Sequence, residues 1–165
     1  MKRALLLFAA AALSACGPAA AGGDGFDINL VVSRGLLDSI SAFQVALVTH
    51  GTSLDCVTVQ KTCLKDQVDA ARFVPLKDSA GATQKALRFD INLTPGSPNT
   101  QDVSLKDLPL GRDYALVVEA LTRESPPRLF GSSCNYVKEL TAGTNSTVFA
   151  KIELLATPAA CDPTL

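Results

Sequence analysis

The feature that most constrains the fold is an alternation of apolar and polar residues with a period of two. In FDINLVV (26–32) every second residue is apolar, and KALRFDINL (85–93) repeats the pattern. This period is typical of a strand with one face on a core and the other in solvent. Glycine and proline gather between such runs, as in TPGSPN (94–99), and interrupt each strand after a few residues. The pattern therefore predicts short strands rather than long helices.

Seven strands are predicted in this way. The run DYALVVEAL (113–121) is apolar on both sides, which is typical of a central strand with at least one well-covered face. Residues 36–47 also fit a helical spacing, but we favour a turn at Arg34–Gly35 followed by a strand, because β-branched residues dominate there. The predicted strands are 26–32, 42–49, 85–93, 102–105, 113–121, 136–140 and 146–155.

Two further elements are predicted between and after these strands. The stretch KDQVDAARF (65–73) does not alternate and predicts one short helix. Near the end, TAGTN lies between the last two strands, and its Gly143 and Asn145 suit a turn. The last two strands are therefore predicted to form a hairpin.

The first fifteen residues have the composition of an export signal. Lys2 and Arg3 are followed by the apolar run ALLLFAAAAL and then by small residues. This order is typical of a helical signal peptide, and the apolar run is too short to span a bilayer as a helix. We expect residues 1–15 to be removed on export.

The segment Leu13-Ser14-Ala15-Cys16 resembles the lipobox of bacterial lipoproteins. The resemblance implies that the Cys16 thiol is joined to diacylglycerol, that the chain is cut before Cys16, and that the new amino group is acylated, commonly with palmitate. Two or three chains hold a protein durably, whereas one holds it only marginally. Gly17, in place of an aspartate, favours the outer membrane over the inner membrane of the cell envelope. Residues 16–25 would form the lipidated, flexible tether and residues 26–165 the domain.

Charge restricts the class of partner. The formal net charge is −1 for the whole chain and becomes −3 once Lys2 and Arg3 leave with the signal. A mildly acidic domain argues against nucleic acid, since phosphate binding needs a basic face. The expected partners are the membrane, through the lipid on Cys16, and an envelope protein that the sequence does not identify.

The stretch LPLGRDYALVVEA (108–120) resembles a motif of transthyretin-like and immunoglobulin-like sandwich modules in bacterial surface proteins. There, a strand ends in Leu-Pro, a turn with glycine follows, and a tyrosine opens the next strand; here these residues are Leu108-Pro109, Gly111 and Tyr114. The predicted fold is all-β: a single antiparallel immunoglobulin-like or transthyretin-like β-sandwich of about seven strands.

The other four of the five cysteines predict disulfides. Outside the cytoplasm thiols oxidise, and four cysteines allow three pairings. Only six residues separate Cys56 from Cys63, so we predict that these two pair and that Cys134 pairs with Cys161. A metal site is not predicted, because the chain has no C-x-x-C motif and one histidine.

His50 is the only histidine in the sequence, so a catalytic histidine could only be His50. A hydrolase would combine it with a serine and an acid such as Asp55, but there is no G-x-S-x-G motif. The acids of DGFDIN (Asp24, Asp27, with Asn29) miss the spacing of a calcium loop. Beside a bacterial lipobox, the sequons at Asn92 and Asn145 indicate a strand end and a turn.

We therefore expect no catalytic residue, cofactor or metal, and a non-enzymatic envelope module that acts through protein or surface contact. The loop RESPPRLFGSS (123–133) combines charge with apolar character and is the first place to look for a binding surface. The alternative is an extracytoplasmic hydrolase with its site around His50.

Overall fold

The computed structural model describes residues 25–31, 39–91, 100–142 and 145–165. Helical segments are few and short: η2 (Gly51–Ser53), α1 (Cys56–Val59), α2 (Leu64–Gln67) and η3 (Ala70–Arg72). The strands are β1 (Gly25–Val31), β2 (Ile40–Thr49), β3 (Leu76–Lys77), β4 (Thr83–Gln84), β5 (Leu87–Asp90), β6 (Thr100–Leu105), β7 (Gly111–Thr122), β8 (Leu129–Leu140), β9 (Asn145–Lys151) and β10 (Glu153–Leu154).

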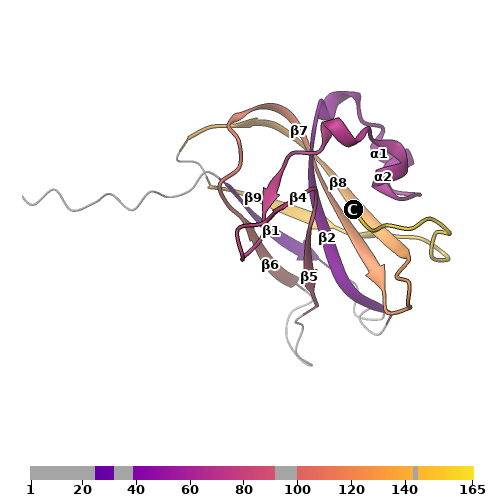
Figure 1. The fold of residues 1–165 in the computed structure, drawn as a ribbon. Helices are drawn as coiled ribbons and strands as arrows, with labels where there is room; N and C mark the ends of the chain where they lie inside the picture. The colour runs from indigo at the N-terminus through magenta and orange to yellow at the C-terminus, as the bar shows by residue number, and fades with distance from the viewer. Residues whose placement is uncertain (1–24, 32–38, 92–99, 143–144) are drawn as a thin grey trace, which may run out of the picture.

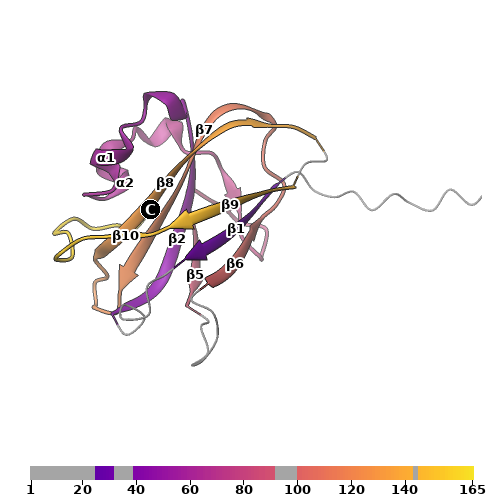
Figure 2. The ribbon, with the colours of Figure 1, turned by 180° about the vertical axis from the view of Figure 1, so that it is seen from behind.

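Two sheets lie face to face, as the opposite views in Figures 1 and 2 show. The larger sheet has the order β10-β8-β7-β2-β5 and the smaller the order β6-β1-β9, while β3 and β4 form a separate two-stranded ribbon. The predicted all-β, sandwich-like fold is therefore confirmed. Each of the seven predicted strands has a counterpart among the strands of four or more residues.

One strand neighbour was predicted wrongly. β8 and β9 do not form a hairpin: β9 pairs with β1, in parallel, with Val148 opposite Ile28. Only the two residues of β10 return to β8, where Glu153 lies opposite Ser132. Alternation determines which side chains face the core, but it does not choose between folding back within one sheet and crossing to the other. Here the chain crosses to the other sheet.

The main core lies between the two sheets. It includes Ile28 and Leu30 from β1, Val45 from β2, and Leu116 and Val118 from β7, all fully buried. These residues are the apolar positions of the period-two runs. Burial of their side chains is the main favourable contribution to folding.

A second apolar cluster lies on the other face of the larger sheet. Val48 and Val117 there contact residues of the helical segment, among them Val59 and Leu64. β7 is therefore buried on both faces, which explains why its sequence is apolar on both sides.

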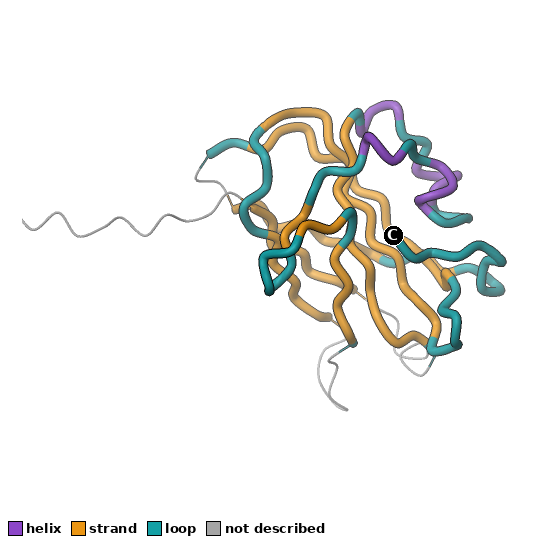
Figure 3. The backbone as a smooth tube through the Cα atoms, viewed as in Figure 1, coloured by secondary structure: helices purple, strands orange, loops and turns teal. Residues whose placement is uncertain are grey.

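Residues 51–72, which contain η2, α1, α2 and η3, form a helical cap on this outer face. Figure 3 shows these helical turns gathered at one corner of the fold. Where one helix was predicted at 65–73, the structure has two short ones, α2 and η3, separated by Val68 and Asp69, and α1 was not predicted. Asp55 begins α1 by accepting from the backbone N–H groups of Val57 and Thr58. Within the part of the chain that is described, no helix has the length and apolarity needed to cross a membrane.

The residues of the Leu-Pro, glycine and tyrosine motif meet at one corner of the sandwich. The Tyr114 hydroxyl donates to the Pro109 carbonyl at 3.2 Å. Gly111 lies against the same ring, and a Cβ there would lie 2.5 Å from the hydroxyl oxygen. A larger residue at position 111 would therefore displace the Tyr114 hydroxyl from its place beside Pro109.

Candidate binding site on the outer face of the five-stranded sheet

A row of polar residues crosses the outer face of the larger sheet. Its registers place Arg88 of β5 opposite Gln44 of β2, Gln44 opposite Glu119 of β7, and Glu119 opposite Ser132 of β8. Directly opposed residues of antiparallel strands project from the same face. Most of their neighbours on this face are apolar, so the row is the chemically distinct feature there.

Glu119 is the centre of this row and is only 2 % exposed. Its Oε2 accepts from Gln44 Nε2 at 2.9 Å, and its Oε1 accepts from the backbone N–H of Leu64 at 2.8 Å. Gln44 Nε2 also donates to the Pro163 carbonyl at 2.8 Å. The carboxyl group of Glu119 thereby connects β7 to β2 and to the first residue of α2, and Gln44 extends this connection to the C-terminal segment.

Burial raises the pKa of Glu119 from its ordinary value of 4.5 to about 7, because the charged form loses its hydration. The donors at Leu64 and Gln44 lower this pKa in part. Of the nearby charges, Asp66 raises it and Lys65 lowers it. The carboxyl therefore changes its charge within the physiological range of pH.

Beside Glu119 in the row, Ser132 is completely buried. Its Oγ has no hydrogen-bond partner in the described structure. A buried hydroxyl without a partner costs about 1–3 kcal/mol. Its burial also shows that this serine is not placed as an accessible nucleophile.

Two disulfides hold the cap and the C-terminal segment in place. Cys56, at the start of α1, is bonded to Cys134 of β8, with their Cα atoms 5.5 Å apart. Cys63, the residue before α2, is bonded to Cys161, with a Cα separation of 5.9 Å. Lys65 supports the second link through an ion pair with Asp162 at 2.7 Å.

The predicted pairing of Cys56 with Cys63 and of Cys134 with Cys161 is therefore wrong, although all four cysteines do form disulfides. The reason is α1, which lies between the first two cysteines. Cys56 opens α1 and meets β8, whereas Cys63 follows it and meets the C-terminal segment, so closeness in sequence is a poor guide.

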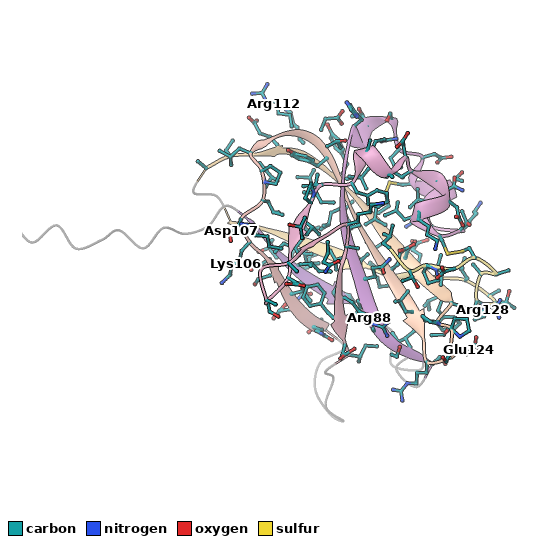
Figure 4. All side chains as sticks on the ribbon, in the orientation of Figure 1. Arg88, Lys106, Asp107, Arg112, Glu124 and Arg128 are labelled. Atoms are coloured by element: carbon teal, nitrogen blue, oxygen red, sulfur yellow. A yellow bond between two sulfur atoms is a disulfide. The ribbon has the colours of Figure 1, made fainter. Side chains whose placement is uncertain are left out.

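A groove of about 600 Å³ adjoins the polar row. Strands β2, β5 and β7 contribute residues to it, as do the β3–β4 ribbon and the C-terminal segment. Figure 4 labels Arg88 on the sheet, well apart from Arg112. The lining residues are Gln44, Asp78, Ser79, Gln84, Ala86, Leu87, Arg88, Phe89, Leu121, Thr164 and Leu165. This volume is in the range of small-molecule sites.

The residues proposed for a hydrolase are not brought together. No hydrogen bond of the His50 ring is present among the described residues, and Ser53 Oγ instead donates to the His50 backbone carbonyl at 2.8 Å. Asp55, the acid suggested for His50, caps α1 and accepts from Thr58 Oγ1 at 2.6 Å. The carboxylate is thus committed to the helix start.

The other predicted positions are distributed over the surface. On the outer face of the smaller sheet, Asn29 donates to Asp102 at 2.7 Å and Ser104 donates to Asp27 at 2.6 Å. Both are side-chain hydrogen bonds between directly opposed residues of β1 and β6. In the described residues, the one cluster with metal-ligand types is Cys63, Asp66 and Cys161, and both its sulfurs are in a disulfide. Cys16, Asp24 and Asn92 lie outside the described residues, as do the turns predicted at 34–35 and at Gly143; the side chain of Asn145 is also not described.

The loop predicted at 123–133 is shorter in the structure: residues 123–128 connect β7 to β8, and residues 129–133 belong to β8. This connection is anchored to the C-terminal segment. Arg128 donates to the carbonyls of Pro158 and Ala159 at 2.6 and 3.1 Å. A hollow of about 410 Å³ lies beside it, lined in part by Arg123, Glu124 and Phe130. The groove at Arg88 is larger and was not predicted.

Comparison with known proteins adds no relative. No protein-family model, curated protein or solved structure matches this chain.

The sequence did contain a signal for Glu119. It is the one charged residue within the long apolar run of β7, ALVVEAL (115–121). A charge in a strand buried on both faces must be paired or hydrogen-bonded, so its position alone marks a polar contact in the interior.

Tryptic mapping without reduction tests the disulfides. Cleavage after Arg34, Lys61, Lys65, Arg128 and Lys151 places the four cysteines in four separate peptides. We expect TCLK (62–65) to be linked to residues 152–165, and residues 35–61 to be linked to LFGSSCNYVK (129–138). Mass spectrometry identifies each pair, and a link between residues 35–61 and TCLK would contradict the structure.

The pH dependence of stability tests Glu119. Its pKa is higher in the folded than in the unfolded chain, so the folded state holds the proton more tightly. Its stabilising contribution is complete below pH 4.5 and is lost as pH rises through about 7. That shift corresponds to about 3 kcal/mol.

In urea unfolding with disulfides intact, Glu119→Gln should flatten this part of the profile. Glu124→Gln, which removes an exposed carboxylate, is the control and should keep the wild-type slope. An unchanged slope in Glu119→Gln would show that another group causes it.

Proposed function

We propose that the chain is an exported, lipid-anchored and non-enzymatic module of the bacterial envelope that acts by contact with another protein or with the cell surface. The observation that carries the proposal is the pairing of cysteines. Cys56, Cys63, Cys134 and Cys161 are all consumed in two disulfides within the domain. Of the five cysteines, Cys16 alone has no partner within its chain, and it stands at the end of the lipobox.

The position of the disulfides agrees with an extracytoplasmic location. Both join surface elements of the cap to the sheet or to the C-terminal segment. Such bonds form and persist in oxidising compartments and are rare in the cytosol. The outer membrane is the proposed destination because Gly17, not aspartate, follows Cys16.

A candidate contact surface lies on the outer face of the smaller sheet. Phe149 is 70 % exposed, on β9 at the edge of this sheet, and lies opposite Asn29. Val31 on the next strand is also exposed and faces the same way. An exposed aromatic side chain among polar ones is the kind of anchor that protein interfaces use. We define Phe149 and Val31 as the apolar contact patch.

Lipidation is tested at the N-terminus. We expect the mature protein to begin at Cys16 and to carry a diacylglyceryl thioether, seen as a mass increase of its N-terminal peptide. Cys16→Ser should move the protein from the membrane to the soluble fraction, because it removes the acyl chains. Ser14→Ala keeps a small residue in the lipobox and should stay in the membrane. An unmodified Cys16, or a mature chain starting elsewhere, refutes the anchor.

Contact through the patch is tested by site-specific photocrosslinking in intact cells. A photoreactive residue at position 149 should give discrete, protein-sized adducts. The control is position 57, where Val57 is 62 % exposed on α1, a helix that lies apart from β1 and β9 in Figures 1 and 2. Equal adducts at both positions, or none at 149, would remove the patch from the proposal while leaving the anchor intact.

A further inference from the structure

We propose that the groove beside Arg88 binds a small amphiphilic carboxylate, with its acyl chain on the aliphatic lining and its carboxylate on the Arg88 guanidinium. The site is independent of the lipid on Cys16 and of the apolar contact patch. It lies on the outer face of the larger sheet, whereas the patch lies on the outer face of the smaller one.

The lining indicates a ligand with an aliphatic body. Its apolar residues on this face are Ala86, Leu121 and Leu165, all of them aliphatic. Leu87 and Phe89 also border the groove, but they alternate with Arg88 along β5 and pack against the core between the sheets. An aliphatic wall suits a flexible methylene chain, which gains by leaving water and does not need a stacking partner. The volume of about 600 Å³ admits a chain of medium length.

Charge indicates the head group. Two opposite charges line the groove, and Asp78 is already satisfied by its own turn. Its Oδ1 accepts from the backbone N–H groups of Ala80 and Ala82 at 2.9 and 2.8 Å. These hydrogen bonds hold the pKa of the Asp78 carboxyl below its ordinary value, so it stays a structural anion.

Arg88 has its hydrogen-bonding capacity available. No hydrogen bond or ion pair of its guanidinium is present among the described residues. A guanidinium presents two parallel N–H donors that match a carboxylate. Arg88 is therefore the group in the groove that selects an anion.

The inner end of the groove fixes the orientation of the ligand. Gln44 stands there, and its Nε2 already donates to Glu119 and to Pro163. Leu121, 2 % exposed, lies on the same strand as Glu119, two residues further on. Because Gln44 Nε2 already uses both of its N–H bonds, this end of the groove offers no amide donor to a carboxylate, so the acyl chain points inward and the carboxylate stays at Arg88.

Photoaffinity labelling tests the site on the protein as it is isolated. The probe is dodecanoate with a photoreactive diazirine at the chain end, used below its micelle concentration. We expect labels in the tryptic peptides 113–123 and 152–165, which carry Leu121 and Leu165 of the apolar lining, and competition by unlabelled dodecanoate. Labels spread evenly along the chain would overturn the proposal.

Matched variants identify the head-group contact. Arg88→Gln should raise the concentration of dodecanoate needed for half competition by about tenfold, because a charge-assisted hydrogen bond is lost. Arg112→Gln removes a guanidinium that is 77 % exposed on β7 and does not line the groove, so this variant should behave as wild type. Equal effects of the two variants would refute the role of Arg88.

Two further experiments distinguish the contribution of the acyl chain of the ligand from that of its carboxylate. Dodecanol has the same chain without the charge and should compete about tenfold more weakly than dodecanoate. Ser79→Trp places an indole at the exposed turn lining the groove and should abolish labelling while Arg88 is kept. Dodecanol that competes as well as dodecanoate, or undiminished labelling of Ser79→Trp, would contradict the proposed binding mode.

Discussion

The buried carboxyl of Glu119 is the interaction on which the outer face of the larger sheet depends. A charge in the middle of a central strand is costly unless it is hydrogen-bonded, and here two donors meet it. The donors come from Gln44 on the neighbouring strand and from the first backbone N–H of α2. Glu119 therefore positions the helical cap directly, through Leu64. It positions the C-terminal segment indirectly, because Gln44 also donates to the Pro163 carbonyl. Both of these border the polar row, and the C-terminal segment forms one wall of the groove.

The two disulfides reinforce this arrangement over long distances in the chain. They join residues 78 and 98 positions apart. In the chain-entropy description, closing a long loop restricts the unfolded chain more than closing a short one. The observed pairing therefore constrains more of the unfolded chain than the predicted Cys56–Cys63 link would. It also attaches the α1 turn to β8 and the residue before α2 to the C-terminal segment.

The strands could be predicted from the sequence because side-chain alternation is a local property. Alternation at 146–155 correctly predicted a strand with Val148 and Ala150 toward the core, yet this strand was given the wrong neighbour, and Leu154, predicted on the same face, lies exposed on β10 of the other sheet. Neighbours, disulfide partners and the groove depend on contacts between distant segments, which a local pattern does not encode. α1 was missed for a different reason: with four residues it is too short to show a helical period. Asp55, which caps it, was interpreted instead as a possible catalytic acid.

Glu119 shows how a sequence can indicate a site without specifying it. Its place in an apolar strand requires a buried polar partner, but the partners lie 75 and 55 residues away, at Gln44 and Leu64. The groove is built in the same way, from β2, β5, β7, the β3–β4 ribbon and the C-terminal segment. The predicted tether, by contrast, leads directly into β1 of the other sheet, which also carries Val31. The two sheets thus divide the proposed tasks: the smaller sheet bears the proposed contact patch, while the larger sheet holds the buried carboxyl and the groove. Because these surfaces share no residues, occupation of the groove leaves the contact patch open.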